Sequence, residues 1–163
     1  ITKYVNLIIL IADDDNYIAI LKLKENPFKK DLTLSESNLY DGQEVFSAGF
    51  PGLGNDPVWQ FGKGIVTNSK ARIKDLIDPS VSTIIQHSAQ VDSGNSGGPL
   101  MIVSKTGTAG YEVIGINTWK ALGREATNFA LPIKLAKDLI EKSKKNLNDA
   151  ESKAERLSKL KSF

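Results

Sequence analysis

The sequence predicts an all-β fold, either a barrel or a sandwich, followed by one C-terminal helix. Short apolar runs recur at intervals of roughly ten residues, and glycine, proline or polar turn residues separate them. No helical pattern stands between consecutive runs, as it would in a βαβ fold. Beyond Pro132 the spacing of apolar residues changes to that of a helix.

The expected strands are the apolar runs themselves. The first two, at 5–12 and 18–23, flank an acidic corner and predict a hairpin. Tyr40-Asp41-Gly42 is typical of a turn. The segment GFPGLGNDP at 49–57 is also expected to be a turn, because it lacks the Gly-Lys-Ser/Thr of a phosphate-binding loop. The later strands are expected at 44–48, 59–68, 82–89, 99–104, 111–119 and 128–132.

The segment 133–163 is expected to be an amphipathic helix, distinct from a domain at 1–132. Its small and apolar residues follow alternating spacings of three and four, typical of a heptad seam, at Ile133, Ala136, Ile140, Ser143, Leu147, Ala150, Ala154 and Leu157. Alanine and serine at half of these sites make the seam weak. Two interpretations stay open. One is a single helix that packs its first turns on the barrel and ends as a solvated linker, and the other is a self-associating coiled coil.

Composition argues against several classes of function. The 163 residues carry 21 basic and 19 acidic side chains, a near balance that does not indicate nucleic acid or an anionic membrane as a partner. No apolar run approaches the ~20 residues that a membrane-spanning helix needs. There is no cysteine, and the acids at 13–15 lack the spacing of a calcium loop. We therefore expect no metal and no other cofactor.

The stretch VDSGNSGGPL at 91–100 is ambiguous alone, since it suits either a nucleophile loop around Ser96 or a tight glycine turn. The order of the other segments along the chain is YIAIL, GQEVFSAGFPG, GKGIVTN, IIQHSA, GNSGGPL, VIGINTW and NFALP. This series resembles the chymotrypsin-like serine proteases, and most closely their HtrA-type bacterial branch, over residues 4–133. The resemblance implies a trypsin-like double antiparallel β-barrel with the active site between the barrels. The chain would supply all of the second barrel but only part of the first.

The resemblance implies a role for each residue at the centre of this motif. Ser96 matches the nucleophile, which attacks a scissile carbonyl once a neighbouring base accepts its proton. The backbone N–H groups of Gly94 and Ser96, on either side of Asn95, match the oxyanion hole that stabilises the developing negative charge.

Two further segments match the substrate cleft of this family. Asn117, Thr118 and Trp119 match the strand that lines it, although Trp119 would also suit an ordinary core position. Gln90 matches a position near the base of the primary specificity pocket. A neutral amide there does not favour arginine or lysine in the substrate.

The residues that activate the serine in this family do not match. The position of the catalytic histidine falls before Ile1, and the only histidine, His87, lies downstream, where a structural or pocket-wall role is expected. Tyr17 stands where the family has the aspartate that orients the histidine. Its phenol has an unperturbed pKa of about 10 and supplies no negative charge at neutral pH. Asp15 would need a local bulge to take that place.

Two functions therefore stay open. The first is an HtrA-type serine endopeptidase domain that is inactive as this truncated chain and depends on an upstream segment to complete the first barrel and supply the histidine. The second is a pseudoprotease that keeps the fold as a peptide-binding or protein-binding module. Both imply a protein or peptide as substrate or ligand. HtrA-like proteases are commonly extracytoplasmic, periplasmic or secreted, and many continue into a PDZ domain where this sequence enters its helix.

Overall fold

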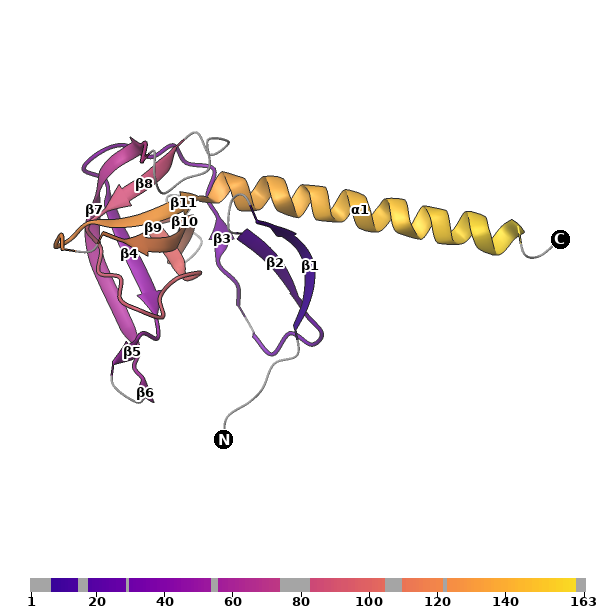
Figure 1. Cartoon of the computed structure of the whole chain (residues 1–163), viewed down its shortest axis with the longest axis horizontal. Coiled ribbons are helices and arrows are strands. Elements are labelled where there is room, and N and C mark those ends of the chain that lie inside the picture. The colour runs from indigo at the N-terminus through magenta and orange to yellow at the C-terminus, as the bar shows by residue number, and fades with distance from the viewer. Residues whose placement is uncertain are drawn as a thin grey trace. The chain divides into compact units, whose positions relative to one another are not determined.

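The computed structural model describes residues 7–14, 18–28, 30–53, 56–73, 83–104, 110–121 and 123–160. These described residues form β-strands and one long helix (Figure 1). They divide into two compact units, Phe28–Lys134 on the one hand and Ile1–Pro27 with Leu135–Phe163 on the other.

The described part of the unit Phe28–Lys134 contains a closed ring of six antiparallel strands. Their order is β11-β8-β7-β4-β9-β10, and a further pairing of β10 with β11 closes the ring. Their bounds are β4 Glu44–Gly49, β7 Gln60–Ala71, β8 Ile84–His87, β9 Pro99–Val103, β10 Tyr111–Lys120 and β11 Asn128–Pro132. The short strand β3 (Thr33–Leu34) pairs with β10 in parallel, outside the ring. Closure satisfies the strand edges that an open sheet would leave unpaired.

Apolar side chains fill the interior of this barrel. The buried core cluster consists of Val45, Val66, Ile85, Ala89, Leu100, Ile102, Ile114 and Ala130. Burial of each larger member contributes about 1.5–3 kcal/mol relative to exposure. The core draws on all six strands, so the strands hold one another in place.

The predicted barrel strands are confirmed, with some ends shifted. Strand β7 continues to Ala71, beyond the predicted end at 68, because β-bulges let it keep pairing with β8. Segment 49–57, expected to be only a turn, contains the short strands β5 (Gly52–Leu53) and β6 (Asp56–Pro57). A ladder of two residue pairs carries no alternation that a sequence pattern could show.

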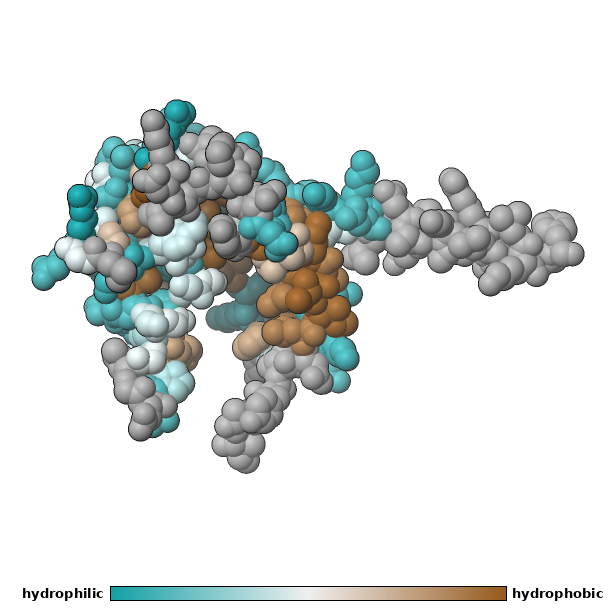
Figure 2. Space-filling model, in the orientation of Figure 1, coloured by the Kyte–Doolittle hydropathy of each residue, from teal (hydrophilic) through white to brown (hydrophobic). Residues whose placement is uncertain are grey.

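The predicted hairpin is confirmed as β1 (Leu7–Asp13) and β2 (Ile18–Leu23), with a bulge between Ile9 and Ile11. Leu7, Ile8 and Ile9 are all about half exposed or more, at 51%, 46% and 67%. Successive residues of a strand point to opposite faces, so both faces of this two-stranded sheet present apolar side chains. Figure 2 shows the hydrophobic side chains that gather over the hairpin.

The C-terminal helix α1 runs from Ile133 to Leu160 and begins where the sequence pattern changes. Ala136 and Ser143 of the predicted seam are buried, but the buried residue between them is Leu139, whereas Ile140 is only half-buried. The helical stripe thus follows a different spacing there from the expected heptad. Neither the separation of 133–163 as a domain nor its self-association is tested, and both stay predictions. No helix within the described residues is long and apolar enough to cross a membrane.

Some of the buried side chains of the barrel strands are polar. His87, Asn117 and Asn128 are 0%, 0% and 2% exposed. Neither ring nitrogen of His87 has a hydrogen-bond partner among the described residues. Burial lowers the pKa of His87 to about 4, and the nearby Asn117 side chain opposes this shift without reaching hydrogen-bond geometry. His87 is therefore neutral near pH 7.

We expect Gly64→Ala to destabilise the barrel by about 1–3 kcal/mol, the usual cost of overpacking. A Cβ at Gly64 would come closer than 3.0 Å to backbone atoms of Ser88 and Ala89, which cannot move without shifting a strand. Urea unfolding measures the change. Gly52→Ala is the matched control because a Cβ there has open space around it. Equal unfolding midpoints for the two variants would contradict the predicted close approach.

We also expect the barrel to lose stability as acid is added. The unfolded chain binds a proton at His87 with the ordinary pKa of 6.5, whereas the folded protein binds it only near pH 4. The free energy of unfolding therefore falls between these two pH values, by roughly 3 kcal/mol in total. Urea unfolding at pH 7 and pH 4 measures this loss in the wild type and in His87→Phe, which cannot titrate. The variant should show a pH dependence smaller by about 2–3 kcal/mol. The same dependence in both proteins would show that His87 is not the source.

Candidate functional site

Ser96 lies exposed in a sharp loop that joins β8 to β9. Gly94 and Gly97, on either side of it, have φ values of +100° and +85°. This left-handed region is open to glycine without the penalty that a Cβ brings. The two interpretations of the motif are thus compatible, since the glycine turn is what presents the serine.

Strand β10 holds the segment after Ser96 through Asn117. The Gly97 amide donates to the Asn117 carbonyl at 2.8 Å, and the Asn117 amide donates to the Gly98 carbonyl at 2.9 Å. The Asn117 side chain donates from Nδ2 to the Pro99 carbonyl at 3.0 Å. The Asn117 side chain is buried, and the residue joins the serine loop to β10. That this strand lines a substrate cleft stays a prediction.

The hydroxyl of Ser96 contacts the next residue of β10. Ser96 Oγ donates to the Thr118 carbonyl at 3.0 Å. A backbone carbonyl is not a base, so this contact orients the hydroxyl without making it more nucleophilic. The structure thus brings Ser96 together with Asn117 and Thr118, and it places Trp119 beside them on β10 as a half-buried side chain.

Among the described residues, the two amides matched to the oxyanion hole have no hydrogen-bond acceptor. Neither Gly94 N–H nor Ser96 N–H donates a hydrogen bond to any of the described residues. The Ser93 carbonyl accepts from the Gly52 amide at 3.2 Å. Because N–H and C=O of a trans peptide point in opposite directions, the Gly94 N–H points away from Gly52. Both donors are therefore available to a negatively charged oxygen.

Gln90 lines a cavity of about 180 Å³ beside the serine loop. The other lining residues are Ser88, Val91, Lys120, Ala126 and Asn128. No acidic side chain contributes to this lining. The Gln90 carbonyl accepts from Ser47 Oγ at 2.6 Å, which ties this end of the cavity to β4.

Three residues that the sequence patterns did not single out meet at this loop. Asp92 accepts hydrogen bonds from Gln60 at 3.0 Å and from Lys120 at 3.1 Å. These hydrogen bonds, that of Gln60 first, lower the pKa of Asp92 below its ordinary value. Asp92 belongs to the serine motif and could have been considered, but Gln60 lies 32 residues earlier and carries no signal of its own.

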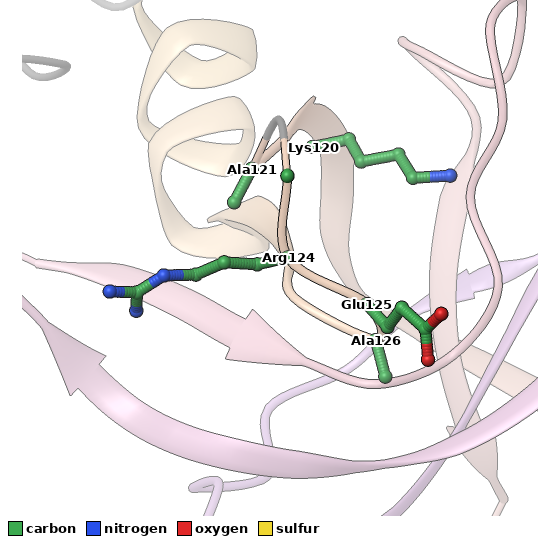
Figure 3. Close-up of a pocket in the computed structure, with 6 residues that line it drawn as sticks. Lys120, Ala121, Arg124, Glu125 and Ala126 are labelled. Atoms are coloured by element: carbon green, nitrogen blue, oxygen red, sulfur yellow. The ribbon is translucent and has the colours of Figure 1, made fainter.

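A second cavity, of about 480 Å³, lies at the loop between β10 and β11. Figure 3 shows that Lys120 and Arg124 extend to opposite sides of this loop, with Glu125 and Ala126 at its far end. Ala126 has a φ of +50°, an unusual conformation for a residue with a Cβ. Lys120 and Ala126 contribute to both cavities.

Of the residues that the sequence analysis considered for activation of the serine, the structure describes His87 but not Tyr17 or Asp15. His87 lies in the barrel interior and makes no hydrogen bond within the described residues, so it cannot accept the proton of the exposed Ser96. Tyr17 and Asp15 lie outside the described residues. Within the described ranges there is no group of histidine, cysteine and acidic side chains that could hold a metal ion.

Comparison with known proteins places this site in a family. The Trypsin-like peptidase domain family matches residues 4–116. "Protease Do-like 5, chloroplastic" of Arabidopsis thaliana is 36% identical over 128 residues, which are 74% of this chain and 37% of the relative. "Serine protease Do-like HtrB" of Bacillus subtilis is 30% identical over 128 residues, 74% of this chain and 26% of the relative. The chain thus spans well under half the length of these relatives.

Solved structures give the same result. The HtrA-type protease AlgW, determined with a decapeptide, is 27% identical with a TM-score of 0.67, and the match covers 86% of this chain and 40% of that one. The serine endoprotease from Yersinia pestis is 25% identical with a TM-score of 0.62, covering 85% of this chain and 44% of that one. The hairpin β1–β2 is a partial first barrel, and the six-stranded ring is the other barrel. The chain therefore belongs to the trypsin-like peptidase domain family, as an HtrA-like serine protease domain.

Proposed function

We propose that this chain is an endopeptidase domain in which Ser96 is the nucleophile, and that residues 1–163 alone do not cleave peptides. One observation carries the first part: an exposed serine hydroxyl lies beside two backbone N–H groups, of Gly94 and Ser96, that are unengaged among the described residues. In acyl transfer, Ser96 Oγ would attack the scissile carbonyl and the two N–H groups would stabilise the resulting oxyanion. Water would then hydrolyse the acyl-enzyme.

The end of β10 offers a place for the substrate backbone. Pairing of β10 with β9 ends at Ile116, and beyond Asn117 no described strand occupies that side of β10. An extended peptide can add to such an edge through main-chain hydrogen bonds. The decapeptide in the AlgW structure supports a peptide as the ligand here. Gln90 and its cavity would then receive one uncharged side chain next to the scissile bond.

The second part of the proposal rests on the missing base. A serine hydroxyl needs a partner that accepts its proton, and here the proton points to the Thr118 carbonyl. His87 is buried elsewhere, and Tyr17 has a phenol in place of the carboxylate that would orient a histidine. A base would have to come from outside residues 1–163, on a segment that also completes the barrel to which the hairpin β1–β2 belongs.

The alternative is a pseudoprotease that binds peptides without cleaving them. An apolar groove of about 560 Å³ in the unit Phe28–Lys134 favours it. Exposed aromatic rings contribute to the groove, among them Phe50, Trp59 and Phe61, at 59%, 57% and 46% exposure. Such rings can hold apolar side chains of a bound segment whether or not Ser96 reacts.

Fluorophosphonate labelling separates these functions, because the reagent modifies a serine that has both a base and an oxyanion hole. We expect no adduct on folded residues 1–163, and an adduct on Ser96 in the complete natural polypeptide, located by mass spectrometry. Ser96→Ala is the control and should remove the label. Labelling of residues 1–163 would contradict the missing base. A folded complete polypeptide that stays unlabelled would contradict the endopeptidase and support the pseudoprotease.

A further inference from the structure

The carboxylate of Asp92 is the centre of a polar network behind the serine loop. Its Oδ2 accepts from Gln60 Nε2 and from Gln90 Nε2, each at 3.0 Å. Its Oδ1 accepts from Lys120 Nζ at 3.1 Å. The four residues come from β7, from the loop before Ser96 and from the end of β10. One negative charge thus connects three separate segments.

The direction of each hydrogen bond follows from that charge. An ionised carboxylate can only accept, so Gln60 must turn its NH₂ group toward Asp92. The Gln60 oxygen then faces the opposite way, where Asn95 Nδ2 donates to it at 2.8 Å. Asn95 is 3% exposed and has little room to turn, because its carboxamide oxygen lies directly against Gly49. The charge at Asp92 therefore determines how Asn95 is oriented.

We propose that Asp92 and Gln60 are positioning residues for Ser96, and that they act by orienting Asn95 at the centre of the loop. The backbone of Asn95 anchors the loop on both sides of the serine. Its amide donates to the Asp92 carbonyl at 3.0 Å, and its carbonyl accepts from the Gly98 amide at 3.0 Å. A change in the Asn95 side chain is thus transmitted to the turn that presents Ser96. The inference deepens the proposed function and rests on it for the role of Ser96.

The network explains why an amide, and not an acid, precedes the serine. With aspartate at position 95, the Gln60 oxygen would face a second acceptor. Rotation of the Gln60 amide would relieve that contact only by turning its oxygen toward Asp92. One acceptor–acceptor contact would remain in either orientation, and such a contact is costly where water is excluded.

Hydrogen exchange of the serine loop tests the network without any need for catalysis. In the peptide 91–100, three amides of the loop before β9 donate backbone hydrogen bonds, those of Asn95, Gly97 and Gly98. We expect Asn95→Asp and Asp92→Asn each to speed their exchange by about tenfold or more, the effect of weakening local structure. Glu44→Gln is the matched control, since it makes the same carboxylate-to-amide change in an exposed ion pair with Lys63 at 2.8 Å. It should leave the peptide unchanged.

A double variant in which positions 92 and 95 swap their side chains tests whether the effect comes from the orientation of the Gln60 amide or from loss of packing. In the double variant Asp92→Asn with Asn95→Asp, the Gln60 amide can rotate and again pair a donor with an acceptor on each side. We expect exchange of peptide 91–100 to return to within about threefold of the wild type, a non-additive result. Additive effects of the two changes would overturn the proposal.

A second variant distinguishes local loosening of the serine loop from unfolding of the whole barrel. Gln60→Met keeps the length of the side chain and removes both of its hydrogen bonds, so it should loosen peptide 91–100 while strands β8 and β11 exchange as in the wild type. Unchanged exchange in 91–100 would overturn the proposal, and so would equal acceleration throughout the barrel. In the complete natural polypeptide, Gln60→Met should also slow fluorophosphonate labelling of Ser96 by about tenfold. If even the wild type is not labelled, the proposed function fails while the exchange result still decides the positioning role.

Discussion

Strand β10 is hydrogen-bonded on both sides, and the arrangement of the site depends on where each of these pairings ends. Its pairing with β9 runs from Tyr111 to Ile116, and its pairing with β11 runs from Gly115 to Lys120. The overlap closes the barrel. Because of the offset, the pairing of β10 with β9 ends at Ile116, and at the next residue, Asn117, the backbone of β10 is hydrogen-bonded to the serine loop. One strand thus completes the core, holds the nucleophile loop and exposes an edge that a peptide could use.

The serine loop is consequently held by two kinds of interaction with different physical properties. On the β10 side, two hydrogen bonds between backbone groups depend on the strand's position, and the Asn117 side chain and the Ser96 hydroxyl each add a contact to a backbone carbonyl. A bulge in the pairing of β10 with β11 between Asn117 and Trp119 changes the local direction of the chain, as bulges beside functional sites do. On the β7 side the contacts pass through Gln60 and Asp92 and depend on the charge and orientation of those groups. The first set places the loop and the second sets its conformation.

The sequence predicts those features that a local pattern encodes. Apolar alternation gives the barrel strands, and the motif around Ser96, with its glycines, indicates an exposed serine in a tight turn. The short strands β3, β5 and β6 have too few residues to alternate. The pair Gln60 and Asp92 is 32 residues apart and meets only because β7 folds back beside the loop. A structural or pocket-wall role is expected for His87 from the sequence, but β8 is buried on both faces, so its pattern does not show that the ring lies in the barrel interior.

The two proposed functions differ in whether a base accepts the proton of Ser96 Oγ, and the fold alone does not determine this. Every group of the site that the structure describes, namely the hydroxyl, the two amide donors and the β10 edge, belongs to the unit Phe28–Lys134. These groups are assembled by backbone pairing that is needed to close the barrel in any case, so they would persist after loss of a base. Meanwhile the hydroxyl of Ser96 donates its hydrogen bond to the Thr118 carbonyl. An intact serine loop is therefore what both an active protease and a pseudoprotease would show, and reactivity of the serine is the property that separates them.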